Sequence, residues 1–390
     1  MPWREVSKMD QRREFVRLAL EDGVNRRELM RRCGIHPKTG YKWLARFGQG
    51  EVSLCDRSRR PHASPSRTAD GIEERIVALR DAHPAWGARK LARCLEREGL
   101  ECPAVSTVHE ILRRHGRVVP APGGAVAKLR FEKEAPNLLW QMDFKGWIAL
   151  TRGGRCHPLT IVDDHSRYAI GLEACGDEQG STVRQRLERI FRRYGLPEAF
   201  FVDNGTPWGD SGGQHWTRFG VWLLKLGVDV IHSRPYHPQS RGKNERFHRT
   251  LKAEVLALRH FRDLVEVQRA LDSWRTVYNL DRPHEALGQD VPASRYRPSH
   301  RAMPNRLPSV EYGTKEIVRI VSSTKGYVSF KGRLWKVPQA FCGERLAIRP
   351  LSTDGTYGAF FAAHQVATID LTAPESVGHV SEQASAMSPD

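Results

Sequence analysis

Residues 141–174 read QMDFKGWIALTRGGRCHPLTIVDDHSRYAIGLEA. Three runs rich in β-branched and apolar residues alternate here with turn-forming residues at 152–154 (Arg-Gly-Gly) and 164–166 (Asp-His-Ser). Short runs of this kind joined by turn signals predict a three-stranded antiparallel meander. The runs occupy residues 141–150, 156–163 and 166–174.

Helical and strand patterns alternate after the meander. Helices are predicted over 179–194 and 217–226, strands over 197–203 and 228–232, and two final helices over 243–258 and 263–279. This order predicts an α/β core domain, residues 136–300, with a mixed five-stranded sheet and flanking helices.

The first 55 residues predict a helix-turn-helix domain. Helices are expected over 10–21 and 26–33, and Pro37 suits the first turn of a third helix. We expect Tyr41, Leu44 and Phe47 to face inward and the polar side to meet the major groove. An ordinary three-helix bundle is the alternative. The candidate DNA contacts on this helix are Lys38, Thr39, Lys42 and Arg46.

Residues 56–67 are rich in Arg, Pro and Ser and lack periodicity, which predicts a basic linker arm. Such an arm suits a minor groove or a track of phosphates, although a plain solvated linker has the same composition. Its candidate DNA contacts are Arg57, Arg59 and Arg60.

Residues 68–118 predict a second helix-turn-helix domain. Its third helix is expected over 106–115, after Pro103, with Ser106 as the capping residue. Arg113 and Arg114 are expected on the exposed side of that helix, so Ser106, Arg113 and Arg114 are candidate DNA contacts.

The C-terminal part divides into two segments. Short β-rich runs at regular spacing over 310–372 predict a small β-barrel. Residues 373–390 carry acidic residues and no Lys or Arg, and we expect a disordered tail.

The formal net charge of +17 and the pI near 9.8 indicate a polyanionic partner, with nucleic acid as the leading class. The seven cysteines are dispersed without a CxxC pair, which favours reduced thiols over disulfides or a zinc site. No apolar run reaches membrane length. We therefore expect a soluble, intracellular protein without a membrane partner.

Three segments carry the carboxylates that could perform chemistry: 140–144 (WQMDF), 201–208 (FVDNGTPW) and 236–252. Asp143 lies in the first predicted strand, Asp203 ends a later one, and Glu245 lies in the first turn of a long helix. Magnesium prefers such hard oxygen ligands, and three carboxylates can hold two ions about 3.5–4 Å apart. One ion would activate the attacking oxygen and the other would stabilise the leaving oxygen.

The helix that carries Glu245 is predicted to be amphipathic. Glu245, Arg249 and Lys252 share one side, where a carboxylate beside two cations could bind metal and grip phosphates. A solvated Glu–Arg helix pair is the alternative. The opposite, apolar side is expected to hold Phe247, Leu251, Val255 and Leu258.

The strings DNG (203–205), RPYHPQS (234–240) and GKNERFHRTLK (242–252) resemble the DDE transposases of bacterial insertion sequences, relatives of retroviral integrases. The resemblance extends over most of the chain and implies an RNase H-like core. It implies that Asp143, Asp203 and Glu245 are the catalytic metal ligands, with two Mg²⁺ ions that Mn²⁺ could replace. Arg249 and Lys252 match positions that touch the DNA end in relatives. Further DNA contacts are expected at His237, Gln239 and Lys243.

The resemblance also implies location, function and partners. The protein would be bacterial, cytoplasmic and nucleoid-associated. The protein would bind the terminal inverted repeats of its element and target DNA, at least as a dimer on paired ends, and would cleave and join strands. The alternatives are a DNA nuclease without joining activity and a helix-turn-helix regulator with an inactive core.

One departure from the family concerns the third carboxylate. The 41 residues between Asp203 and Glu245 exceed the usual spacing, which we assign to an insertion at 209–213. If that alignment is wrong, Glu254 is the rival ligand. Asp163 and Asp164 are further rivals in the core, where a turn-capping role is the alternative.

Overall fold

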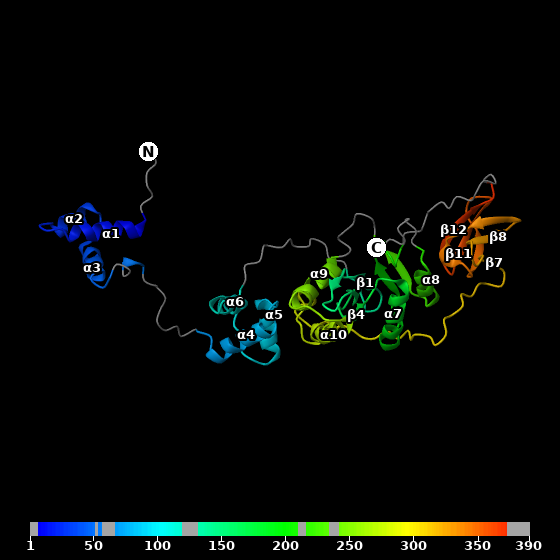
Figure 1. Cartoon of the computed structure of the whole chain (residues 1–390), viewed down its shortest axis with the longest axis horizontal. Helices are drawn as coiled ribbons and strands as arrows, with labels where there is room; N and C mark the ends of the chain where they lie inside the picture. Colours follow the sequence, from blue (N-terminus) through cyan, green and yellow to red (C-terminus); the bar gives the residue numbers. More distant parts are fainter. Residues whose placement is uncertain are drawn as a thin grey trace. The chain divides into compact units, whose positions relative to one another are not determined.

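The computed structural model describes residues 7–50, 54–56, 67–118, 132–209, 216–233 and 242–372 (Figure 1). The chain divides into two compact units, Met1–Arg67 and Thr68–Asp390, which are described separately below. None of the helices in the described ranges combines the length and hydrophobicity needed to cross a bilayer.

The first unit contains three helices around a small apolar core. Ser7 caps α1 by accepting a hydrogen bond from the Asp10 backbone N–H, and Pro37 occupies the first turn of α3. The core comprises Phe15, Val16, Ala19, Met30, Trp43 and Leu54. The helices are α1 (Lys8–Ala19), α2 (Arg26–Arg32) and α3 (Pro37–Phe47).

The buried face of α3 differs from the sequence expectation. Tyr41 is 46% exposed, whereas Trp43 and Gly40 are buried. A Cβ added to Gly40 would lie 2.5 Å from Cε of Met30, so α2 packs directly on the backbone of α3 there. This close approach rotates the helix so that Trp43, not Tyr41, enters the core.

The second unit begins with another three-helix group, which packs around Trp86, Leu91 and Ile111. Its third helix begins at Val105 with Ala104 at the N-cap and without a side-chain capping hydrogen bond. The expected cap at Ser106 is therefore wrong, because that residue lies inside the first turn. The helices are α4 (Asp70–Ala82), α5 (Ala88–Arg97) and α6 (Val105–Arg114).

The core sheet is mixed, as predicted. The expected meander forms, with β1 and β4 each antiparallel to β3, and β1–β5 and β5–β6 are parallel pairs. The run 141–150 is interrupted at Gly146 (φ 86°), so the short β2 forms a separate sixth strand. The strands are β1 (Trp140–Phe144), β2 (Ile148–Ala149), β3 (Arg155–Asp163), β4 (Ala169–Cys175), β5 (Ala199–Val202) and β6 (Asp229–His232).

Helices cover both faces of this sheet (Figure 1). Trp140 and Met142 of β1 face the core formed with α7 (Gly180–Tyr194) and α8 (Arg218–Lys225). Val162 and Leu172, on the other face, pack against α9 (Gly242–Leu251) and α10 (Leu264–Leu280). Because side chains alternate along a strand, the odd-numbered positions of β1 face α9 and α10.

The C-terminal strands enclose a third core. β7, β10, β11 and β12 form a four-stranded antiparallel sheet, and β8 pairs with β9 in a hairpin, where the sequence indicated a small barrel. Val221 and Leu224 of α8 join this core, and Lys225 forms an ion pair with Glu344 at 2.9 Å. The strands are β7 (Ile317–Ile320), β8 (Tyr327–Phe330), β9 (Arg333–Lys336), β10 (Arg345–Pro350), β11 (Thr356–Phe361) and β12 (His364–Asp370).

Candidate active site and DNA-contact residues

The pairing of β1 with β5 relates the positions of Asp143 and Asp203. Trp140 pairs with Phe200, and Gln141 with Phe201, in the parallel strands β1 and β5. Extending this register by two residues brings Asp143 next to Asp203, on strands spaced by about 4.8 Å. Side-chain alternation directs Asp143 away from the α7–α8 core and toward the face that α9 covers.

The turn after β5 fixes Asp203. Its Oδ1 accepts a hydrogen bond from the Gly205 backbone N–H at 3.0 Å, and its carbonyl oxygen lies 3.0 Å from Nδ1 of His232. The Asn204 side chain donates to the carbonyl of Ser233 at 3.1 Å. The Asp-Asn-Gly turn is thereby tied to the end of β6, which restricts the orientation of the Asp203 carboxylate.

Glu245 lies in the first turn of α9 and is exposed, as is Arg249. The expected apolar stripe is only partly correct, because Phe247, Leu251 and Val255 are buried while Leu258 is 62% exposed. The cause is the end of the helical structure: a π-helical turn, Lys252–Leu256, closes it, and Leu258 lies in the turn beyond. Lys252 is exposed at the start of the π-helical turn.

The three carboxylates suit a divalent cation because their oxygens are hard ligands. Asp143 and Asp203 lie near the ends of neighbouring strands, and Glu245 lies on the helix that covers that face of the sheet. The three carboxylates are not arranged as a closed metal-binding site. Within the described ranges, no three His, Cys, Asp or Glu side chains come close enough to hold a metal ion. Like charges repel, so carboxylates without a cation between them have a lower energy apart.

Glu254, the rival third ligand, has structural partners. Its Oε1 accepts a hydrogen bond from Nε of Arg282 at 3.0 Å, and its Oε2 accepts from Nε1 of Trp274 at 2.8 Å. Both side chains of the Glu254–Arg282 pair are 10% exposed. Both carboxylate oxygens are therefore engaged in joining the π-helical turn after α9 to α10 and to Arg282 just beyond it.

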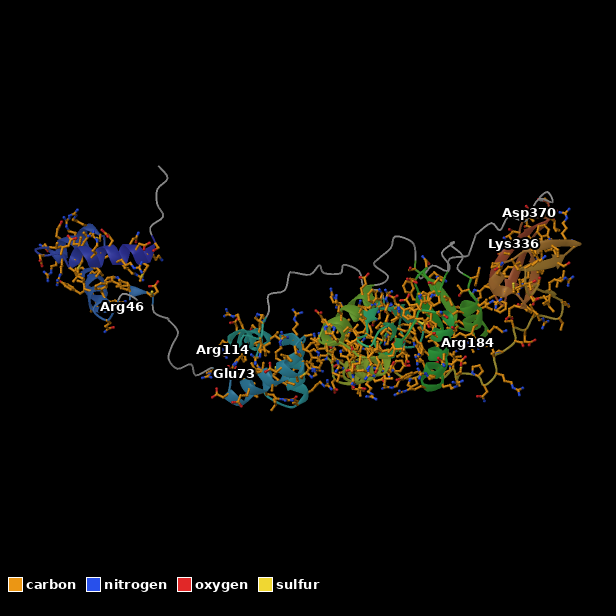
Figure 2. All side chains as sticks on the ribbon, viewed as in Figure 1. Arg46, Glu73, Arg114, Arg184, Lys336 and Asp370 are labelled. Atoms are coloured by element: carbon orange, nitrogen blue, oxygen red, sulfur yellow. The ribbon has the colours of Figure 1, made fainter. Side chains whose placement is uncertain are left out.

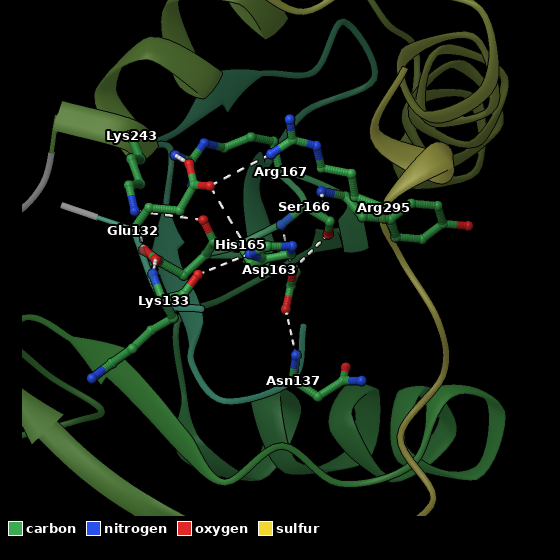
Figure 3. Close-up of polar contacts among 11 residues, drawn as sticks. Glu132, Lys133, Asn137, Asp163, His165, Ser166, Arg167, Lys243 and Arg295 are labelled. Atoms are coloured by element: carbon green, nitrogen blue, oxygen red, sulfur yellow. Dashed lines mark hydrogen bonds and ion pairs between the residues drawn. The ribbon is translucent and has the colours of Figure 1, made fainter. Parts of the chain in front are cut away.

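Asp163 stabilises the corner between β3 and β4 (Figure 3), and Asp164 follows it in the same turn. Oδ1 of Asp163 accepts from the backbone and side chain of Ser166, and its Oδ2 accepts from the Asn137 backbone at 2.8 Å. Burial raises the pKa of Asp163. Asp164 accepts hydrogen bonds from the Lys133 backbone N–H and from the Gln141 side chain. These contacts support the turn-capping interpretation of Asp163, whereas Asp164 links the turn to β1 and to the segment before it.

Lys243, expected to contact DNA, forms an ion pair with Asp164 instead. The Lys243 side chain is 20% exposed, and that of Asp164 is fully buried. A DNA contact by Lys243 would have to break this pair and leave the Asp164 charge uncompensated, which carries a large free-energy cost.

The candidate contacts on α3 lie beside the Trp43 ring. Lys42 Nζ is 5.4 Å and the Arg46 guanidinium carbon 4.9 Å from the ring centroid, within the range of cation–π interactions. Lys38 and Lys42 are exposed, and Thr39 and Arg46 are half-buried. The cations thus lie on the outer side of the third helix.

The candidate contacts on α6 differ from one another. Arg114 forms an ion pair with the buried Glu73 at 2.8 Å, a pair labelled in Figure 2, so it links α6 to α4. Arg113 pairs with Glu110 on the surface, and Ser106 is exposed in the first turn. Arg57, Arg59, Arg60, His237, Gln239, most of the 209–213 insertion and the 373–390 tail lie outside the described residues.

Two polar residues next to the carboxylates, Thr160 and His248, had no role predicted from the sequence. Thr160 lies opposite Asp143 in the β1–β3 register, and its hydroxyl contacts both the Asp143 carbonyl and the His248 ring. The available signal was a threonine inside an apolar strand and a histidine three residues after Glu245. Neither residue, taken alone, predicts the hydrogen bond between the Thr160 hydroxyl and the His248 ring.

Comparisons with known proteins place this site in a family. Two models named "Integrase core domain" match residues 133–238 and 226–292, and "IS481 family transposase, C-terminal domain" matches 316–376. "Helix-turn-helix domain" matches 11–62 and "Homeodomain-like domain" matches 39–112. A protein of insertion element IS407 from Burkholderia multivorans is 29% identical over 252 residues, 62% of this chain and 85% of the relative. The chain is an insertion-sequence transposase with an integrase core.

Other similarities extend the comparison. A protein of insertion element IS476 from Xanthomonas euvesicatoria is 26% identical and covers 69% of the transposase and 75% of the relative. A structure of the HTLV-2 integrase catalytic core with magnesium aligns at 15% identity and a TM-score of 0.32, over 42% of this chain and 99% of that one. The helix-turn-helix domains make the transposase a DNA-binding protein that acts in DNA transposition.

Replacing Lys38, Lys42 and Arg46 by alanine in the full chain should weaken binding to the element's ends. The slope of log affinity against log salt should flatten by about 0.9 for each phosphate that the variant no longer touches. The matched control is Arg31→Ala on α2, whose guanidinium already pairs with Glu28 at 2.7 Å. A triple variant that folds and keeps the wild-type affinity and salt slope would exclude α3 as the DNA-contacting helix.

Proposed function

We propose that the transposase binds the terminal inverted repeats of its mobile element and that Asp143, Asp203 and Glu245 hold two divalent cations, Mg²⁺ or Mn²⁺, for strand cleavage and strand transfer. The observation that supports this proposal is the register of β1 and β5, which, continued by two residues, would bring Asp143 beside Asp203 on the face covered by the helix of Glu245. Bound cations would activate the attacking oxygen and stabilise the leaving oxygen.

Both steps would be phosphoryl transfers at the same carboxylates. In cleavage, a water oxygen bonds to the scissile phosphorus, and the 3′-oxygen departs as the new 3′-hydroxyl. In strand transfer, this 3′-hydroxyl attacks a phosphorus of the target strand, and the target's own 3′-oxygen departs. Neither step needs a covalent protein intermediate, so no nucleophilic side chain is required.

Arg249 and Lys252 would hold the DNA end against this site. Both are exposed, and Arg249 lies one helical turn after Glu245. Together with the resemblance to insertion-sequence transposases, the need to join paired ends supports action as at least a dimer.

Alanine at Arg249 and at Lys252 should each slow cleavage, and should slow joining at least as much, because joining must hold two DNA segments. The helix should remain folded, since alanine is a strong helix former and the buried face is unchanged. Product analysis with end-labelled DNA and supercoiled target in Mg²⁺ or Mn²⁺ measures both steps. Arg189→Ala on α7, an exposed cation paired with Glu173, is the matched control.

The same assay tests the proposed function. Wild-type protein should give both a nicked product and a strand joined to the target. Nicked product alone, under every metal and target supplied, would favour the alternative of a nuclease without joining activity.

A further inference from the structure

A buried chain of hydrogen bonds connects the helix of Glu245 to the backbone of Asp143. The Thr160 hydroxyl lies 2.9 Å from the Asp143 carbonyl oxygen and 2.8 Å from Nε2 of His248. A hydroxyl has one proton, which it donates to the carbonyl, so Nε2–H of His248 must donate to the hydroxyl. We call this His248–Thr160–Asp143 chain the Thr160 bridge.

The Thr160 bridge is inaccessible to DNA. Thr160 is fully buried and His248 is 9% exposed. Burial and the nearby charge of Lys145 lower the pKa of His248 to about 4, so the ring is neutral near pH 7. A neutral, buried imidazole that is hydrogen-bonded to Thr160 cannot serve as a phosphate contact.

A second buried contact lies on the other side of Glu245. Lys243, two residues before Glu245, pairs with Asp164, and Asp164 also accepts a hydrogen bond from the Gln141 side chain at 2.7 Å. Gln141 lies two residues before Asp143 on β1. Polar contacts thus tie α9 to β1 on both sides of the exposed Glu245.

These polar contacts give α9 a directional constraint that its apolar packing does not provide. Phe247 and Leu251 hold the helix on the sheet, but apolar contacts are non-directional and permit small slides and rotations. A buried hydrogen-bond chain has one satisfied arrangement, and other positions leave donors unpaired. It therefore fixes both the rotation and the axial position of the helix.

We propose that Thr160 and His248 are positioning residues that set the location of Glu245 relative to Asp143, so that the two carboxylates can share divalent cations. This inference rests on the proposed function of the three carboxylates. Partners that orient the ligands of a metal site typically change metal affinity or activity by about 10- to 100-fold when they are removed.

The test uses the full-length protein with Thr160→Val, which keeps the shape but removes the hydroxyl, and with His248→Phe. Direct Mn²⁺ binding is measured by electron paramagnetic resonance, and end cleavage is measured across a range of Mg²⁺ concentrations. Each variant should bind Mn²⁺ about 10- to 100-fold more weakly and should need correspondingly more Mg²⁺ for cleavage. Binding to the element's ends should be unchanged, and the double variant should be no worse than the more impaired single variant.

Two further variants separate positioning from general stability. Thr160→Ser restores the hydroxyl and should recover the wild-type Mn²⁺ affinity. Thr250→Val, on the same helix, removes a hydroxyl that donates to the Arg246 carbonyl at 2.9 Å and should leave Mn²⁺ binding unchanged. If Thr160→Val does not fold, the same measurements on His248→Phe test the positioning role. His248→Phe leaves the Thr160–Asp143 hydrogen bond in place.

Wild-type Mn²⁺ affinity and Mg²⁺ dependence in folded Thr160→Val or His248→Phe would overturn the inference, even if the melting temperature falls. The wild-type protein tests the proposed function separately. Absence of Mn²⁺ binding and cleavage in the wild type would contradict that function, whereas a wild type that is active and variants that match it would contradict only the positioning role.

Discussion

Asparagine in place of Asp143 should reduce cleavage of the element's ends by about three orders of magnitude or more, equivalent to about 4 kcal/mol of transition-state stabilisation. The change preserves the size of the side chain but removes a charged metal ligand. Asp203→Asn and Glu245→Gln should have comparable effects, because a two-ion site depends on all its ligands. Binding to the ends should remain, since the helix-turn-helix domains are unchanged.

Single-turnover cleavage of end-labelled DNA measures this effect. Mg²⁺ and Mn²⁺ should support the wild-type reaction and Ca²⁺ should not, because calcium prefers a looser coordination with more ligands. Glu188→Gln on α7, on the opposite face of the sheet, is the matched control. Robust cleavage by any one of the three carboxylate variants would remove that residue from the proposed site.

The second large effect concerns stability. Glu254→Ala should lower the free energy of unfolding by about 3–5 kcal/mol, because it leaves the Arg282 charge buried without its partner. It also removes the acceptor of the Trp274 indole N–H. By contrast, Glu245 is exposed, and Glu245→Ala should change stability by about 0.5 kcal/mol or less. Denaturant unfolding monitored by circular dichroism compares the two variants.

Variants of Glu254 and Glu245 also distinguish between these two candidates for the third metal ligand. A Glu254→Ala protein as stable as the wild type would contradict the structural role of this carboxylate. If folded Glu254→Gln were inactive and Glu245→Gln cleaved normally, the ligand would be Glu254.

Periodicity was sufficient to predict the meander, the parallel strands and the order of the helices, because each of these elements has a continuous apolar pattern. It was also sufficient to find Asp143 and Asp203 at the ends of neighbouring strands. The pairing register that brings them side by side is a long-range property, which the sequence only indicated through the resemblance to a family.

The errors have local physical causes. Aromatic residues at 41, 43 and 47 permit two helix rotations, and only the contact between Gly40 and Met30 selects one. The helix predicted to reach residue 258 ends at Leu256 in a π-helical turn, so the apolar stripe does not extend to Leu258. The ion pair of Lys243 was not predictable from local sequence, because its partner, Asp164, is 79 residues away in the sequence.

The most direct test of the proposed metal site is a crystal structure of the full-length transposase with its DNA ends and Mn²⁺, in which anomalous scattering locates the ions. We expect anomalous peaks at about 2.0–2.2 Å from oxygens of Asp143, Asp203 and Glu245, the spacing typical of small octahedral cations. Ions held by Asp163, Asp164 or Glu254, with none at the three predicted carboxylates, would contradict it.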